Sequence, residues 1–193
     1  MTRWTSKSLA LLLAALMAAC GWKVTPPPRP EGPGTPRRVA DRVVLQMNEG
    51  GVVWGGGRMG ELTRNALIAS GAFSEVYYPI EPRTPPPLRL AIDARGNVDE
   101  EVGFGMVKAV IIGALLFIPV GLIRFNKDFT LDAQVVLLNG GQEVQRFQVS
   151  GATRIAHTMF SDTDSYETAG REAAAAYLAE AIAAQLRRSG PIN

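Results

Sequence analysis

The chain has 193 residues, of which 47% are hydrophobic, and its 20 basic and 18 acidic residues give a formal net charge of +2. Charges this closely balanced, with the densest arginine cluster lying in or beside a proline-rich stretch, argue against nucleic acid as a partner. The single cysteine excludes an internal disulfide, so the fold rests on an ordinary apolar core.

Residues 1–19 have the layout of an export signal peptide. Arg3 and Lys7 form a short basic region, and Leu9–Ala19 form an apolar stretch too short to span a bilayer as a helix. Removing this segment takes away two basic residues and no acid. The mature chain then has 18 basic and 18 acidic residues and a formal net charge of zero.

Cys20 closes this segment. The run Leu16–Cys20, Leu-Met-Ala-Ala-Cys, resembles the lipobox of bacterial lipoproteins, although Met17 stands where leucine is usual. The resemblance implies that Cys20 becomes the first residue of the mature chain and carries acyl chains such as palmitate on its sulfur and amino group. Two or three acyl chains hold a protein firmly to a membrane. The alternative is a secreted protein with a free thiol.

The residue after the cysteine is Gly21 and not aspartate. By resemblance to enterobacterial sorting rules, this favours the outer membrane, with the protein facing the periplasm. Residues 20–38 are expected to form a lipid-anchored, proline-rich linker in extended polyproline II conformation, at roughly 3 Å per residue. The linker would hold a periplasmic domain of residues 39–193 some 40 Å from the anchor.

The first half of this domain predicts strands and one short helix. Strand-like runs occur at 42–47, 52–54, 73–78 and 88–93. Between them, Leu62, Ala66 and Ala69 share one face of a helix over 61–70, and Gly71 lies where a C-cap glycine belongs.

The second half predicts a β-hairpin and a long helix. Apolar and polar residues alternate over 129–137, the turn signal Asn139-Gly140 follows, and Gln145, Phe147 and Val149 share a face of the returning strand. From Asp164 a helix is expected, with a capping box between Asp164 and Glu167. Its apolar stripe and its stop signal are Ala174, Leu178, Ala181, Ile182, Leu186 and Gly190-Pro191.

This order of elements predicts an α/β (α+β) sandwich, in which two helices cover one face of a mixed sheet of about four to six strands. The passage Leu67–Val76, the hairpin at Asn139-Gly140 and the alanine-rich closing helix resemble Gram-negative envelope lipoproteins. That set includes the curli-secretion lipoprotein, the Tol-system amino-terminal domain and the lipoprotein activators of peptidoglycan synthases. No motif in this resemblance carries a functional residue over.

An apolar insertion at 105–125 is the most unusual segment. Residues 109–123 contain no charge, are short for a membrane span and are interrupted by Pro119 and Gly121. Three interpretations stay open: buried core, an apolar hairpin that enters the membrane or docks on a membrane-protein partner, and a single span. The residues predicted to contact membrane or partner are Val110, Ile111, Ile112, Leu115, Leu116, Phe117, Ile118 and Pro119.

Three features of the sequence are candidates for a catalytic or ligand site. Residues 55–60 match G-x-G-x-x-G, but only Glu75 could supply the acidic residue expected after a dinucleotide loop. His157 has serine and aspartate residues nearby in sequence without a nucleophile motif. Asp162, Asp164 and Glu167 depart from a calcium loop. The sequence therefore predicts no catalytic residue, no cofactor and no metal site.

The leading hypothesis is a non-enzymatic, outer-membrane-anchored lipoprotein. It would act as an accessory factor in envelope assembly or transport, through an envelope protein partner, self-association or lipid contacts. The alternatives are a subunit of an oligomeric secretion pore that inserts residues 105–125, and a nucleotide-binding enzyme that uses Gly55–Gly60.

Overall fold

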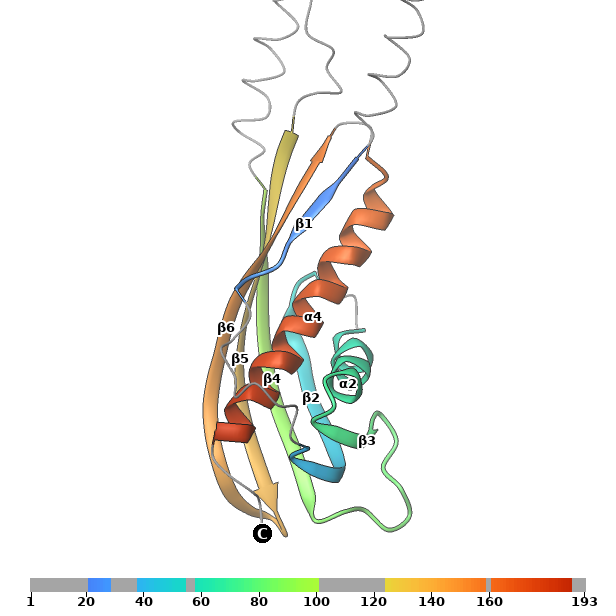
Figure 1. Ribbon diagram of the computed structural model, residues 1–193, viewed down its shortest axis with the longest axis vertical. Helices are drawn as coiled ribbons and strands as arrows, with labels where there is room; N and C mark the ends of the chain where they lie inside the picture. Colours follow the sequence, from blue (N-terminus) through green and yellow to red (C-terminus); the bar gives the residue numbers. More distant parts are fainter. Residues whose placement is uncertain (1–20, 29–37, 55–57, 101–123, 159–160, 189–193) are drawn as a thin grey trace, which may run out of the picture.

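The computed structural model describes residues 21–28, 38–54, 58–100, 124–158 and 161–188. These residues form one six-stranded mixed sheet that curls around two helices on one face (Figure 1). The strand order is β1-β6-β5-β4-β2-β3. This confirms the α+β architecture expected from the order of elements.

The strands are β1 (Lys23–Thr25), β2 (Ala40–Val52), β3 (Phe73–Tyr77), β4 (Leu88–Glu100), β5 (Arg124–Asn139) and β6 (Gln142–Thr158), and the helices are α2 (Met59–Ala69) and α4 (Thr163–Arg188). β2 lies parallel to both of its neighbours, β3 and β4. The pairs β4–β5, β5–β6 and β6–β1 are antiparallel. In Figure 1, α4 crosses the sheet diagonally, from the end where β1 begins towards the end where β5 turns into β6.

The core lies between the sheet and the helices, as the period-two pattern of β5 dictates. Phe129, Leu131, Ala133, Val135 and Leu137 are each at most 3% exposed, whereas Asp132 and Gln134 between them are exposed. From the other side, α4 buries the stripe expected of it. Ala174, Leu178, Ile182 and Leu186 are at most 2% exposed, and Ala181 is partly buried.

The predicted hairpin is present, with its turn one residue later than expected. Gly140 and Gly141 both have positive φ, at 59° and 87°, and Asn139 pairs with Gln142. Two consecutive residues with positive φ define a tight two-residue turn. Glycine adopts positive φ at little cost, so it suits both positions. Asn139 is therefore the last residue of β5, and the two glycines form the turn.

The capping box predicted for the last helix is wrong. The helix begins at Thr163, and the backbone N–H of Tyr166 donates to the carbonyl of Asp162, whose carboxylate accepts from Ser165. The Glu167 side chain instead points towards the sheet and pairs with Lys127 of β5.

Part of the expected linker belongs to the sheet. Lys23, Val24 and Thr25 form β1 and pair with Ala156, Ile155 and Arg154 of β6. The pairing stops there because Pro26 has no N–H to donate to the ladder. An extended tether that begins at Cys20 is therefore wrong for these residues, since only Gly21 and Trp22 lie between Cys20 and the strand.

Candidate functional site

The residues that the sequence predicts to contact lipid or partner, Cys20 and the apolar positions between 110 and 119, lie outside the described part of the chain. Their described neighbours are Gly21 on one side, and Glu100 and Arg124 on the other. Within the described ranges, no helix is long and apolar enough to cross a membrane.

These neighbours meet at one end of the sheet. Lys23 pairs with Ala156, and on the other side of β6 Arg124 pairs with Thr158. Glu100, the last residue of β4, pairs with Lys127. Figure 1 shows the corresponding ends of β1, β4, β5 and β6 at the top of the molecule. With neighbouring strands about 4.8 Å apart, the four strands span about 14 Å at this end. We call it the anchor end.

The first described residue is fixed to this end. The Ser161 hydroxyl donates to the carbonyl of Gly21 over 3.3 Å, and it also bonds Thr158 at the end of β6. Gly21, the residue that follows Cys20 in the chain, therefore lies at the anchor end.

An aromatic row crosses the anchor end on the helix face. Phe125 of β5 pairs in register with His157 of β6, and their rings are 5.9 Å apart. His157 stacks on Tyr166 of α4 at 4.4 Å and 14°. Trp22 directly precedes β1 and is 41% exposed. The tryptophan ring is amphipathic and favours a membrane–water interface.

A cluster of charged residues around the buried Lys127 lies beneath this row. The ammonium of Lys127 is 2.5 Å from Glu100 of β4 and 2.6 Å from Glu167 of α4, and Arg171 pairs with Glu167 at 3.1 Å. The ammonium also lies 5.8 Å and 5.9 Å from the ring centres of Phe129 and Tyr166. We call these four charged residues the Lys127 cluster.

Lys127 stays charged in this setting. Burial opposes the charge, but the hydrogen bonds that Lys127 donates to Glu100 and Glu167 outweigh it, so the pKa of Lys127 is raised above the ordinary lysine value of 10.5. The cluster joins β4, β5 and α4 at the anchor end, and its formal net charge is zero, since its two bases and two acids balance.

Sequence reasoning missed this cluster. The signal that reveals it is the alternation of β5, in which Lys127 occupies an inward position between Phe125 and Phe129. A lysine at a core position of a strand needs a partner on the element packed above it. The first turns of α4 supply Glu167, a residue whose spacing from Asp164 instead predicts helix capping.

The glycine segment does not have the features of a phosphate site in its described part. The carboxylate of Glu49 accepts from the backbone N–H of Met59 over 2.6 Å, so an acid already occupies the N-terminus of α2, where a phosphate would bind. Gly60 packs against the ring of Tyr78, where a Cβ atom would come within 2.1 Å. Its lack of a side chain is explained by this packing.

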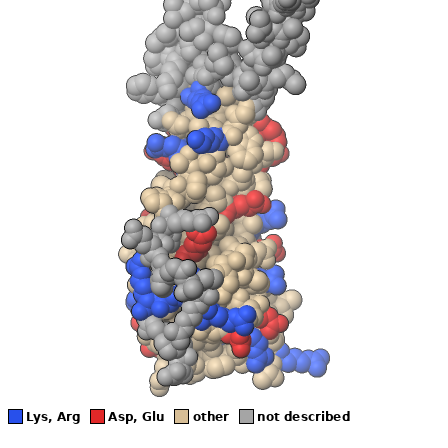
Figure 2. Space-filling view, in the orientation of Figure 1, with Lys and Arg blue, Asp and Glu red and all other residues tan. Residues whose placement is uncertain are grey.

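The residues near His157 form no triad. The ring nitrogen Nδ1 of His157 lies 3.3 Å from the carbonyl of Thr158, and the Ser161 hydroxyl is bonded to Thr158 and Gly21. In the described ranges, no group of three His, Cys, Asp or Glu side chains is placed to hold a metal ion. Figure 2 shows basic and acidic side chains of the described residues intermixed on the face in view.

No protein-family model and no curated protein matches the chain. Solved structures similar to it include a minor lipoprotein from Acinetobacter baumannii, at 9% identity and a TM-score of 0.43, which covers 79% of this chain and 95% of that one. Rare lipoprotein B from Shewanella oneidensis shows 12% identity, a TM-score of 0.34 and coverage of 77% and 92%. A PelC dodecamer from Paraburkholderia phytofirmans shows 12% identity, a TM-score of 0.35 and coverage of 82% and 96%. At these values the chain resembles bacterial lipoproteins in the outline of its fold alone.

Replacing Lys127 tests whether the cluster is a structural unit. Lys127→Met leaves Glu167 partly buried with only Arg171 as its partner, so the free energy of unfolding should fall by about 2 kcal/mol, as measured by urea denaturation. Arg146→Met, which breaks an ion pair whose side chains are 50% and 43% exposed, is the control and should change stability by about 0 to 1 kcal/mol.

The same pair of variants gives a pH signature. Because the pKa of Lys127 is raised by folding, its contribution is complete below pH 10.5 and is lost as the pH rises through the folded-state value. The stability difference between wild type and Lys127→Met should therefore shrink above pH 10.5. If the loss of stability relative to wild type were the same in Lys127→Met and Arg146→Met at every pH, a buried, charged Lys127 would be contradicted.

Proposed function

We propose that this protein is a lipoprotein acylated on Cys20, anchored in the outer membrane and facing the periplasm. It acts as a non-enzymatic accessory factor in envelope assembly or transport, through protein or lipid contacts. One observation carries the proposal. Gly21, which follows Cys20, lies at the anchor end, and so do the ends of β4 and β5 that flank the apolar insertion. An acylated Cys20 would bring the insertion to the same membrane.

The side chains at the anchor end support this orientation. Trp22, next to β1, is exposed, and the basic residues Lys23 and Arg124 are exposed at the same end. An amphipathic aromatic ring flanked by basic side chains is typical of a protein surface that rests in the headgroup region. The opposite end of the sheet carries the glycine turn of the β5–β6 hairpin.

The apolar insertion is assigned its role by position. Val110, Ile111, Ile112, Leu115, Leu116, Phe117, Ile118 and Pro119 are proposed to enter the membrane that holds the anchor, or to dock on a membrane-protein partner within it. The described core between sheet and helices is already built from the strands and from α2 and α4, with Phe129, Leu131 and Val135 almost fully buried. A large apolar surface outside such a core marks an interaction site.

The lipid anchor is tested at its cysteine. Cys20→Ala should abolish incorporation of radiolabelled palmitate and leave the protein unprocessed or released from the membrane, because the thiol is the atom that carries the lipid. Ser161→Ala, which removes the hydrogen bonds to Gly21 and Thr158 but keeps Cys20, is the control and should remain acylated. Palmitate entering Cys20→Ala would contradict the assignment.

The position of Trp22 relative to the bilayer is tested by fluorescence. After removal of residues 1–19 the chain keeps two of its three tryptophans, the exposed Trp22 and the buried Trp54. In proteoliposomes, lipids that carry a quencher near the headgroup should reduce the emission of wild type and leave Trp22→Phe, which reports Trp54 alone, unchanged. Equal quenching of the two proteins would show that Trp22 does not reach the bilayer.

The apolar insertion is tested in a form that begins at Gly21 and is exported by a cleavable signal. Leu115→Asp with Ile118→Lys should end its association with membranes or with itself and keep the fold, because polar groups on an exposed patch cost little stability. The control places the same charges on exposed apolar residues elsewhere, Val144→Asp with Ile80→Lys, and should change nothing.

Circular dichroism and sedimentation separate the outcomes. If the insertion is core, two buried charges should unfold the domain, since each costs several kcal/mol and domains are marginally stable. An unfolded double variant beside a folded control would overturn the proposed contact role.

A further inference from the structure

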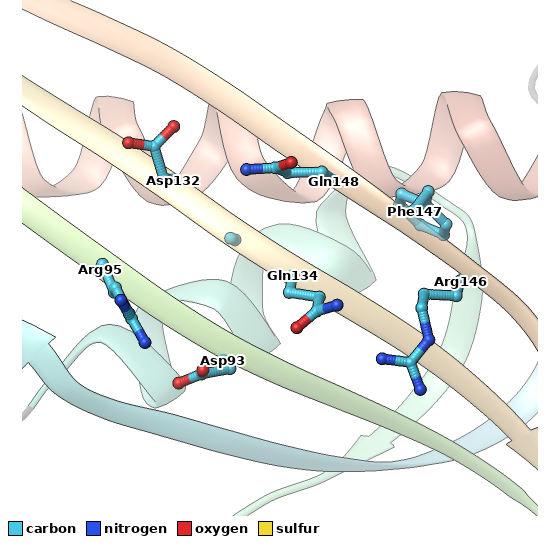
Figure 3. A pocket seen from close by; sticks show the side chains of 8 residues that line it. Asp93, Arg95, Asp132, Gln134, Arg146, Phe147 and Gln148 are labelled. Carbon is cyan, nitrogen blue, oxygen red and sulfur yellow. The ribbon is translucent and has the colours of Figure 1, made fainter.

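The face of the sheet opposite the helices carries a hollow of about 480 Å³ across β4, β5 and β6. Figure 3 shows six polar side chains from the three strands around it. The residues that line the hollow are Asp93, Arg95, Asp132, Ala133, Gln134, Arg146, Phe147 and Gln148.

A second hollow continues the first towards β2. It has a volume of about 370 Å³ and shares Asp93 and Gln134 with the first; Gln46 and Asn48 of β2 lie along it. The two together form a groove that crosses four strands, or about 14 Å at 4.8 Å per strand step. We call it the outer-face groove. Its length suits an elongated ligand that lies across the strands.

The groove is built by cross-strand register. Asp93 pairs with Gln134, Gln134 pairs with Gln148, and Arg95 pairs with Asp132, so the outward side chains of three strands stand in rows. A solvent-facing sheet surface is ordinarily polar, and polarity alone requires no ligand. The hollow adds a concave shape, so that several of these groups line one volume.

Several of these groups have hydrogen-bonding capacity to spare. Asp93 accepts from Asn48 at 2.9 Å, and Arg146 is held by Glu143 in two bonds of 3.0 Å and 2.6 Å. Arg95, Asp132, Gln134 and Gln148 have no side-chain hydrogen bond or ion pair to any residue in the described ranges. A guanidinium, a carboxylate and two amides therefore offer donors and acceptors side by side.

The charges around the groove select the class of ligand. Two arginines and two carboxylates, Asp93 and Asp132, line the groove, and one of the arginines, Arg146, is already paired with Glu143, so the lining has no excess charge of either sign to attract an ionic ligand. The lining is more polar than an apolar ligand would require. Hydroxyl groups both donate and accept, and they can pair with carboxylate, guanidinium and amide alike.

We propose that the outer-face groove binds an uncharged, hydroxyl-rich oligosaccharide. Asp132 accepts from sugar hydroxyls, Arg95 donates to them, and Gln134 and Gln148 do both along the middle of the groove. This site lies on the face away from α2 and α4, and the proposal does not depend on the anchor or on the apolar insertion.

The experiment uses the full mature chain in a detergent without a sugar headgroup, such as lauryldimethylamine oxide, so that detergent cannot compete. Cellotetraose, maltotetraose and chitotetraose are titrated by calorimetry and by ligand-observed NMR. Tetragalacturonate and the deacetylated glucosamine tetramer provide an anionic and a cationic sugar of matched length. At least one neutral tetrasaccharide should bind saturably and more tightly than both charged sugars.

Variants place the binding in the groove. Gln134→Ala with Gln148→Ala should weaken binding of that tetrasaccharide at least tenfold, since two neutral hydrogen bonds are lost. Both glutamines are exposed, so the fold should be kept, as circular dichroism can verify. Ser150→Ala, on the same face of β6 but outside the groove, is the matched control and should bind as wild type does.

Three results would overturn the proposal. They are no saturable binding of any neutral tetrasaccharide, tighter binding of either charged sugar, and an unchanged affinity in the double glutamine variant. Each of them leaves the vesicle and acylation experiments on the anchor end unaffected, so the two proposals fail separately.

Discussion

The pairing of β1 with β6 is the constraint that orients this protein. Three residues, Lys23–Thr25, add to the edge of a long strand, and Pro26 ends the ladder because it has no N–H. Only Gly21 and Trp22 remain between this strand and Cys20. A lipid on Cys20 would therefore determine which end of the sheet faces the membrane, which a long flexible tether would leave undetermined.

The Lys127 cluster fixes α4 relative to that same end. Glu167 comes from the first turns of α4, and Glu100 and Lys127 come from neighbouring strands, so the three hold helix and sheet in one relative position. Desolvation offsets much of the attraction within such a cluster, and its net stabilisation is small compared with that of the apolar core. Above it, His157 stacks on Tyr166 and so adds a second contact between β6 and α4 at this end.

The sequence predicted the elements that rest on local signals. The alternation of β5, the β-hairpin, whose turn was expected one residue early at Asn139-Gly140, and the apolar stripe of α4 each follow a period or a dihedral preference that one sequence displays. β1 was missed because its three residues precede a run of prolines, and its partner on β6 lies about 130 positions away in the chain. The Lys127 cluster and the outer-face groove were missed for the same reason, since both depend on which strands lie side by side.

Membrane depth at the two ends of the sheet tests the central claim most directly. Spin labels are placed by Asp162→Cys at the anchor end and by Val144→Cys near the hairpin turn, two exposed positions, in a chain whose own Cys20 is acylated in proteoliposomes. The label at position 162 should respond to lipid-soluble relaxation agents. The label at position 144, some 50 Å away along strands that rise about 3.3 Å per residue, should respond only to aqueous agents. Equal responses, or lipid exposure at position 144, would contradict the proposed orientation.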